Sequence, residues 1–204
     1  MAESRFRRVT PHAPRAGAPA QEEAFQPGHL AGLGLRLMEP RAPRDICHLL
    51  TDETARLLGA QRVMLVLDTD HALRSAGTFL PAGESPATLL RAIAPWLADA
   101  RQSRKPRLRH GPEGGAPARQ RSCLVAPLVR KKDLVGYLYA DIEGHRGRFE
   151  HGHLEQLATL ADMGAAALAA ALEREYLRAR IALQSQQHER ELREALAHRN
   201  ASAE

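Results

Sequence analysis

Residues that could bind a charged ligand gather in the middle of the chain, between positions 101 and 132. Ten arginines and lysines and one acidic residue give this segment a charge of +9, and the rest of the 204-residue chain carries −4. Guanidinium groups bind carboxylates and phosphates through paired hydrogen bonds, so the segment indicates a site for an anion. The alternative is a solvated, glycine-rich surface loop. Nucleic acid is disfavoured, because no aromatic side chains are interleaved with the arginines.

Two cysteines, Cys47 and Cys123, are too few for a disulfide framework, and neither belongs to a Cys-x-x-Cys pair. A reducing cytoplasm is therefore the simpler prediction. Cys123 is close in sequence to Arg119 and Arg121, which would lower the pKa of an exposed thiol and allow redox sensing. The ordinary alternative is a buried, inert thiol, which we expect for Cys47 on the apolar face of a helix.

Carboxylates and imidazoles between positions 141 and 153 are the candidates for a metal site. They are Asp141, Glu143, His145, His151 and His153. Their spacing matches no recognised site, so we predict no metal. The sequence also has no nucleophile–base constellation, and the glycine-rich stretch 111–115 lacks the Lys-Ser/Thr of a phosphate loop. We therefore expect no enzymatic activity, and the sequence identifies no cofactor.

The apolar pattern predicts the elements that must position these residues. Two apolar runs, 122–129 and 134–142, flank a charged tip and predict a β-hairpin at the centre of the fold. Because they are apolar on both faces, we expect helices on both sides of the sheet. Further strands are expected at 61–68, 72–80 and 106–110. Helices are expected at 29–38, 43–58 and 87–102, the last kinked or restarted at Pro95.

The two ends of the chain differ from this centre. Residues 1–28 are rich in Pro, Ala and Arg and have no apolar period, which predicts a disordered leader. A long helix is expected from residue 150 onward, with small residues at 164–167 that permit close approach of a sheet or another helix. Its second half holds no clean heptad and needs a partner to be stable. No apolar run is long enough to span a bilayer, so no membrane association is predicted.

Four short motifs together resemble a GAF domain over residues 44–172. They are Leu58-Gly59-Ala60 before the first strand, Ala126-Pro127-Leu128 and Leu134-Val135-Gly136 in the hairpin, and Phe149 before the final helix. The resemblance implies an α+β fold: a central antiparallel sheet of five or six strands flanked by helices on both faces, with a long C-terminal helix. One face would be covered by the N- and C-terminal helices, and the other would hold a pocket under the middle helix.

Two subfamily features are missing. The Asn-Lys-x-x-Asp-Glu type motif of cyclic-nucleotide-binding members is not present. Bilin-binding members carry a chromophore cysteine around the middle helix, followed by histidine, whereas Cys47-His48 falls in an early helix.

In such a fold the basic segment would lie beside the mouth of the pocket. The side chains that we expect to contact a ligand are Trp96, Arg107, Arg109, Arg121, Cys123 and Tyr139, with His110 and Arg119 in the same segment. For Trp96 and Tyr139, packing in the core is a compatible alternative.

These expectations define residues 29–176 as a non-catalytic sensory or regulatory module of a cytoplasmic signalling protein, which binds a small ligand, with an anion as one candidate. Residues 177–204 would form a polar signalling helix or coiled coil. We expect a homodimer through the terminal helices, and an output domain of the kinase or cyclase type would lie outside this chain. The alternative is a ligand-free dimerisation and spacer module that uses 164–167 and the distal helix as contacts. A methionine-sulfoxide reductase would need the two cysteines to meet, which their positions disfavour.

Overall fold

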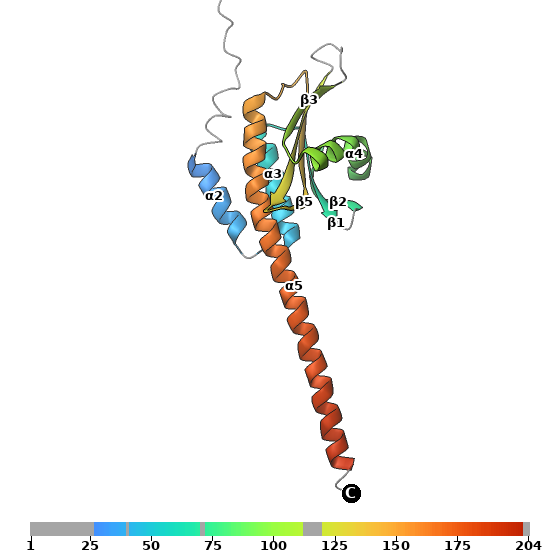
Figure 1. Cartoon of the computed structure of the whole chain (residues 1–204). Helices are drawn as coiled ribbons and strands as arrows, with labels where there is room; N and C mark the ends of the chain where they lie inside the picture. Colours follow the sequence, from blue (N-terminus) through green and yellow to red (C-terminus); the bar gives the residue numbers. More distant parts are fainter. Residues whose placement is uncertain (1–26, 40, 70–71, 112–119, 202–204) are drawn as a thin grey trace, which may run out of the picture.

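The computed structural model describes residues 27–39, 41–69, 72–111 and 120–201. The elements are, in chain order, α2 (Pro27–Met38), α3 (Pro43–Leu58), β1 (Arg62–Thr69), β2 (Ala72–Phe79), α4 (Pro86–Ser103), β3 (Arg107–Gly111), β4 (Arg121–Arg130), β5 (Asp133–Glu143) and α5 (His151–Ala201). The predicted α+β fold, with helices on both faces of an antiparallel sheet and a long C-terminal helix, is confirmed (Figure 1). No helix among the described residues is long and apolar enough to cross a membrane.

One five-stranded sheet has the order β2-β1-β5-β4-β3. The predicted hairpin is β4 and β5, and β5 lies between β4 and β1. Asp141 of β5 is opposite Arg62 of β1 on one side and opposite Cys123 of β4 on the other. Residues directly opposite each other in an antiparallel pair point to the same face. The register therefore brings these three side chains together on one face of the sheet.

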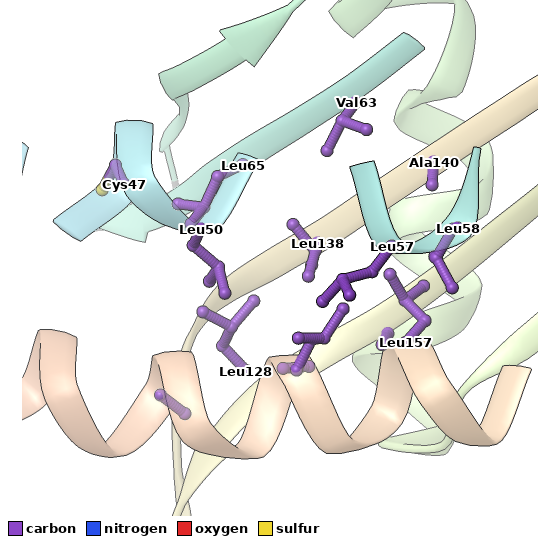
Figure 2. Close-up of a cluster of buried hydrophobic side chains, with 14 of the residues drawn as sticks. Cys47, Leu50, Leu57, Leu58, Val63, Leu65, Leu128, Leu138, Ala140 and Leu157 are labelled. Atoms are coloured by element: carbon purple, nitrogen blue, oxygen red, sulfur yellow. The ribbon is translucent and has the colours of Figure 1, made fainter. Parts of the chain in front are cut away.

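Both faces of the sheet bury a core, as the apolar strands predicted. On one face α2, α3 and α5 close over a cluster of buried side chains that includes Leu50, Leu138 and Leu157 (Figure 2). On the other face lies α4, whose Ile93 and Leu97 pack against the alternate residues of β1, β4 and β5. Because successive side chains of a strand point to opposite faces, the sheet separates a large leucine-rich core from a smaller core under α4.

Two glycines let neighbouring elements approach closely. A Cβ added to Gly136 of β5 would lie 2.1 Å from the carbonyl oxygen of Val66 in β1. A Cβ on Gly164 of α5 would lie 2.2 Å from Cδ2 of Leu50 in α3. Gly164 and the alanines beside it are thus packed inside one chain. The small residues thus allow the close approach of α5 to α3 within one chain, and dimer contacts through residues 164–167 stay a prediction.

The ends of the helices agree with some of the sequence predictions and differ from others. As predicted, α3 begins at Pro43 and ends before Gly59, which adopts the left-handed conformation at φ 60°. The glycines in α2 do not interrupt it, and it begins at Pro27, inside the segment predicted as a leader. Residues 1–26 of that segment lie outside the described residues. α4 continues through Pro95 as one helix rather than restarting there.

Among the side chains of α5 that the structure describes, only those in the first part of the helix pack against the domain. Ala171 is buried, but Leu172 and Tyr176 are 38% and 65% exposed. From residue 175 to 194 all side chains are exposed to solvent, and the helix projects away from the sheet (Figure 1). This is the polar half that the sequence predicted to need a partner.

We predict that Gly136→Ala lowers the free energy of unfolding by about 2–4 kcal/mol, because the new methyl group cannot be placed without separating β5 from β1. Urea denaturation of the full chain would measure this loss. The matched control is Gly111→Ala in the edge strand β3, where none of the residues that the structure describes lies within 4 Å of the added Cβ. This control should change stability by less than about 1 kcal/mol. Equal losses in the two variants would contradict the close approach.

Candidate functional site

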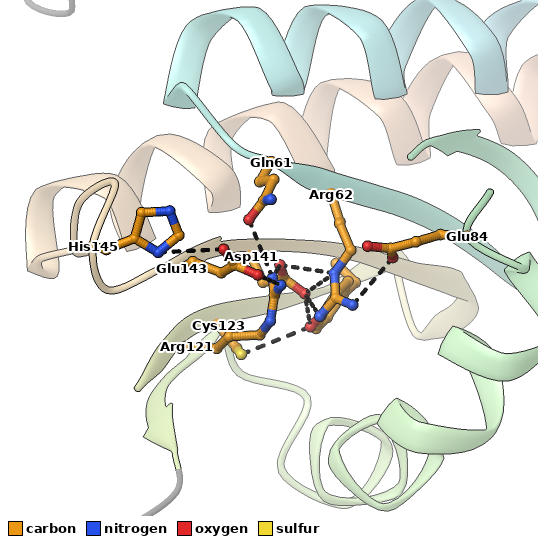
Figure 3. A network of polar contacts seen from close by, with 9 residues as sticks. Gln61, Arg62, Glu84, Arg121, Cys123, Asp141, Glu143 and His145 are labelled. Atoms are coloured by element: carbon orange, nitrogen blue, oxygen red, sulfur yellow. Dashed lines mark hydrogen bonds and ion pairs between the residues drawn. The ribbon is translucent and has the colours of Figure 1, made fainter. Parts of the chain in front are cut away.

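A buried carboxylate, Asp141, lies on the α4 face of the sheet and is 0% exposed. Nε and Nη2 of Arg62 donate to Oδ2 of Asp141 at 2.8 and 2.6 Å, and Nη1 of Arg121 donates to Oδ1 at 2.6 Å (Figure 3). The hydroxyl group of Tyr139 also donates to this carboxylate. A buried charge is tolerated only when it is paired and hydrogen-bonded, and both oxygens of Asp141 meet that condition.

The two arginines extend this network in opposite directions. Nη1 of Arg62 donates to Oε2 of Glu84, in the loop before α4, at 3.2 Å. Nη2 of Arg121 donates to Glu143, whose other oxygen lies 3.3 Å from Nδ1 of His145. We call Arg62, Glu84, Arg121, Asp141 and Glu143 the arginine–carboxylate network. It connects the start of α4 with the segment that leads into α5 (Figure 3).

Burial and the charge of Asp141 set the protonation of Arg62 and Tyr139. Burial works to lower the pKa of Arg62, but the hydrogen bonds and charge of Asp141 outweigh it, so the pKa of Arg62 is raised. Burial raises the pKa of Tyr139, and the charge of Asp141 raises it further. Arg62 is therefore a fixed cation and Tyr139 a fixed hydrogen-bond donor at neutral pH.

Cys123 lies beside the network, with its sulfur 3.7 Å from the hydroxyl oxygen of Tyr139. The thiol is 3% exposed, and burial raises its pKa to about 11 in spite of Arg62 and Arg121 nearby. The thiol is thus buried, as the ordinary alternative predicted, and desolvation of the thiolate outweighs the lowering of its pKa by these arginines. Cys47 is buried on α3, as predicted, and burial likewise raises its pKa to about 11.

A pocket of about 460 Å³ lies between the network and the first half of α4. The ring of Trp96 stacks on Tyr139 with centroids 6.3 Å apart. The pocket is lined by Arg62, Gly83, Glu84, Ser85, Thr88, Leu89, Ala92, Ile93, Trp96, Arg121, Cys123 and Tyr139. An apolar wall facing a few fixed polar groups, at this volume, is typical of small-molecule sites.

The structure brings together four of the six predicted ligand contacts. Trp96, Arg121, Cys123 and Tyr139 all line this pocket. The other two, Arg107 and Arg109, line a separate, open hollow at the end of α4.

The remaining basic candidates have other surroundings. Arg109 is paired with Asp99 of α4. Nδ1 of His110 lies 2.7 Å from Oγ of Ser122 and accepts from Arg148. Arg119 lies outside the described residues. Contact of any of these side chains with a ligand stays a prediction.

Four of the five residues of the arginine–carboxylate network were not predicted as ligand contacts: Arg62, Glu84, Asp141 and Glu143. In the sequence, Asp141 and Glu143 are candidates only for a metal site. The available signal was the alternation Tyr137, Tyr139, Asp141 in β5, which places a carboxylate on the same face as two tyrosines. Recognising its partners required the register of three strands.

The histidine and carboxylate candidates for a metal do not converge. Asp141 is held by arginines, Glu143 contacts Arg121 and His145, and Nδ1 of His153 accepts from the backbone N–H of Glu150 at 3.0 Å. Within the described parts of the chain, no group of three such side chains could hold a metal ion.

Comparison with known proteins identifies the fold with a family. A family model of the GAF domain matches residues 42–168. The chain belongs to the GAF domain family. GAF domains are sensory and regulatory modules of signalling proteins, which agrees with the resemblance carried by the four sequence motifs. No curated protein matches this chain.

Solved structures show the same fold at low sequence identity. A bacteriophytochrome from the photosynthetic bacterium R. palustris has 14% identity and a TM-score of 0.58, over 86% of this chain and 42% of that one. A methyl-accepting chemotaxis protein has 15% identity and a TM-score of 0.56, over 68% and 96%. The GAF domain/HD domain protein from Geobacter sulfurreducens has 14% identity and a TM-score of 0.52, over 70% and 97%. At these sequence identities the similarity shows only that the fold is shared.

For this GAF domain we predict that Asp141→Asn lowers the free energy of unfolding by about 3–5 kcal/mol, because it leaves two half-buried guanidinium groups without their shared anion. Urea denaturation at neutral pH would measure the loss. The matched control is Glu39→Gln, which removes a carboxylate from an exposed pair with Arg41 and should cost less than about 1 kcal/mol. A loss for Asp141→Asn no larger than that of the control would contradict the role given to this carboxylate.

Proposed function

We propose that this GAF domain is a non-catalytic sensor that binds a small ligand in the pocket under α4 and transmits the signal through α5. The observation that carries the proposal is the position of the pocket against the arginine–carboxylate network. Pocket and network share Arg62, Glu84 and Arg121. A ligand that changes the position of any of these side chains therefore changes contacts that reach toward α5.

Strand β4 supports a route for this transmission. Arg121 and Cys123 line the pocket, while Ser122 between them points to the opposite face. There the hydroxyl oxygen of Ser122 accepts the backbone N–H of Phe149, two residues before α5, at 3.0 Å. A ligand would shift α5 between two arrangements only by the difference between its affinities for them.

We predict that a ligand from a panel of nucleotides, cyclic nucleotides, organic acids, amines and metal ions raises the melting temperature of the full chain. At a hundredfold excess over Kd the rise should be about 5 °C or more. Ala92→Trp should abolish this rise, since Ala92 is an exposed residue of α4 at the pocket and an indole there would fill it.

The control for this experiment is Ala87→Trp, at an exposed position of α4 that does not line the pocket. This variant should keep the full response to the ligand. A panel without any stabilising compound, or a response that survives Ala92→Trp, would contradict the pocket as the sensor site.

Dimerisation through α5 is a second candidate function, either together with sensing or as a ligand-free spacer. It is supported by apolar side chains on the projecting half of the helix. Leu172, Tyr176 and Leu183 are exposed, and with Ala179 they follow one another at steps of four, three and four residues. Such a stripe can bury itself against the same stripe of a second chain. A cytoplasmic location and an output domain of the kinase or cyclase type outside this chain belong to the same proposal.

We predict that the full chain sediments as a dimer and that Leu183→Lys weakens its association by at least about tenfold, because a charge would be buried in the helix pair. Sedimentation velocity over a concentration series would measure this. The control is Gln184→Lys, which adds the same charge one residue away, outside the stripe. A monomeric wild-type chain, or equal effects of the two variants, would contradict dimerisation through this stripe.

A further inference from the structure

The charge balance at the pocket points to the chemistry of its ligand. In the arginine–carboxylate network two guanidinium groups face three carboxylates, which leaves one net negative charge. All three guanidinium nitrogens of Arg62 donate to Asp141 or Glu84, and both Nη atoms of Arg121 donate to side-chain oxygens. The arginines that line the pocket therefore already have anionic partners from this chain.

Glu84 is the carboxylate of the network that lines the pocket. It lies in the loop before α4 (Figure 3). Its side chain is 34% exposed. One oxygen, Oε2, accepts from Arg62, whereas Oε1 accepts no hydrogen bond from any residue that the structure describes. Oε1 is therefore a free acceptor with a negative charge beside the pocket, and it favours an N–H donor or a cation.

The other walls of the pocket suit an apolar body attached to such a group. Leu89, Ala92 and Ile93 of α4 supply aliphatic surface, and Trp96 stacked on Tyr139 supplies aromatic surface. Aromatic rings also attract cations through their negative faces. An anion, by contrast, would bring a fourth negative charge to two arginines unless it displaced Glu84 from Arg62.

We infer that the pocket selects small molecules with a cationic or N–H-donating nitrogen head on an apolar or aromatic body, and that Glu84 is the residue that determines this specificity. The inference rests on the proposed sensor function and gives its ligand a chemical class. It reverses the expectation of an anion that the density of arginines in the sequence suggested. Of those arginines, Arg121 is paired with carboxylates at the pocket, and Arg107 and Arg109 lie outside it.

The test uses the full chain and a set of probes that share one body and differ in their head group. Tryptamine, tryptophol and indole-3-acetate carry an ammonium, a hydroxyl and a carboxylate, and further aromatic bodies are included in the same three forms. Binding is measured by ligand-observed NMR and calorimetry, and Ala92→Trp identifies the compounds that occupy the pocket. The specificity variant is Glu84→Gln, and Glu39→Gln is the control for loss of one carboxylate elsewhere.

We expect the amines to bind the wild-type pocket more tightly than the matched alcohols and acids. Glu84→Gln should raise the Kd of the amines by about tenfold to a hundredfold, as expected for loss of a hydrogen bond to a charged group, and should leave the Kd of the alcohols unchanged. Glu39→Gln should leave the Kd of amines, alcohols and acids unchanged. Because Glu84 lies in a partly exposed loop, the variant should keep the wild-type circular dichroism spectrum.

Two results would overturn the inference while leaving the sensor function intact. One is pocket binding that does not depend on the charge of the head group. The other is preferential binding of the acids, made tighter by Glu84→Gln because Arg62 is released. If no compound of any charge binds in a manner that Ala92→Trp blocks, the sensor function itself fails, and this inference fails with it.

Discussion

The buried carboxylate of Asp141 is the constraint on which the other features of this domain depend. It accepts hydrogen bonds from Arg62 of β1 and Arg121 of β4, the strands on either side of its own. A slip of one residue in either strand pair would turn a guanidinium group toward the leucine core under α3 and α5. Either change would leave a buried charge without its partner, which costs several kcal/mol. The ion pairs thus fix the register of three strands as well as the site.

The same constraint accounts for the pocket. The first half of α4 packs Leu89 and Ile93 on apolar positions of the sheet, such as Met64 and Val66. The strands end in charged side chains beyond those positions, and an apolar helix cannot cover charges without a cost in desolvation. Space therefore remains between α4 and the network, and the loop before α4 contributes Glu84 to it. The pocket therefore forms because the arginine–carboxylate network lies at one end of the apolar core between α4 and the sheet.

Sequence patterns could predict the fold because its main signals are local. The apolar runs of β4 and β5, the helix start at Pro43 and the Gly59 cap each act within one element. The site was only partly predictable: Trp96 and Tyr139 could be found as aromatics on core faces, but Arg62 and Glu84 join Asp141 from 79 and 57 positions away in the sequence. The density of arginines does not tell which of them, like Arg109, meet a carboxylate on a neighbouring helix.

Strand β4 also limits how a signal could travel through the domain. On its α5 face the leucine core is filled, with Leu124 and Leu128 fully buried, and a packed core resists gradual deformation. A change at the pocket is therefore more readily passed along the end of the strand, where Arg121 contacts Glu143 and Ser122 binds the backbone at Phe149. These contacts lie at the start of α5, whereas its exposed stripe begins at Leu172. In the proposed mechanism the signal would enter α5 through these contacts, because a rotation of the helix would carry the stripe with it.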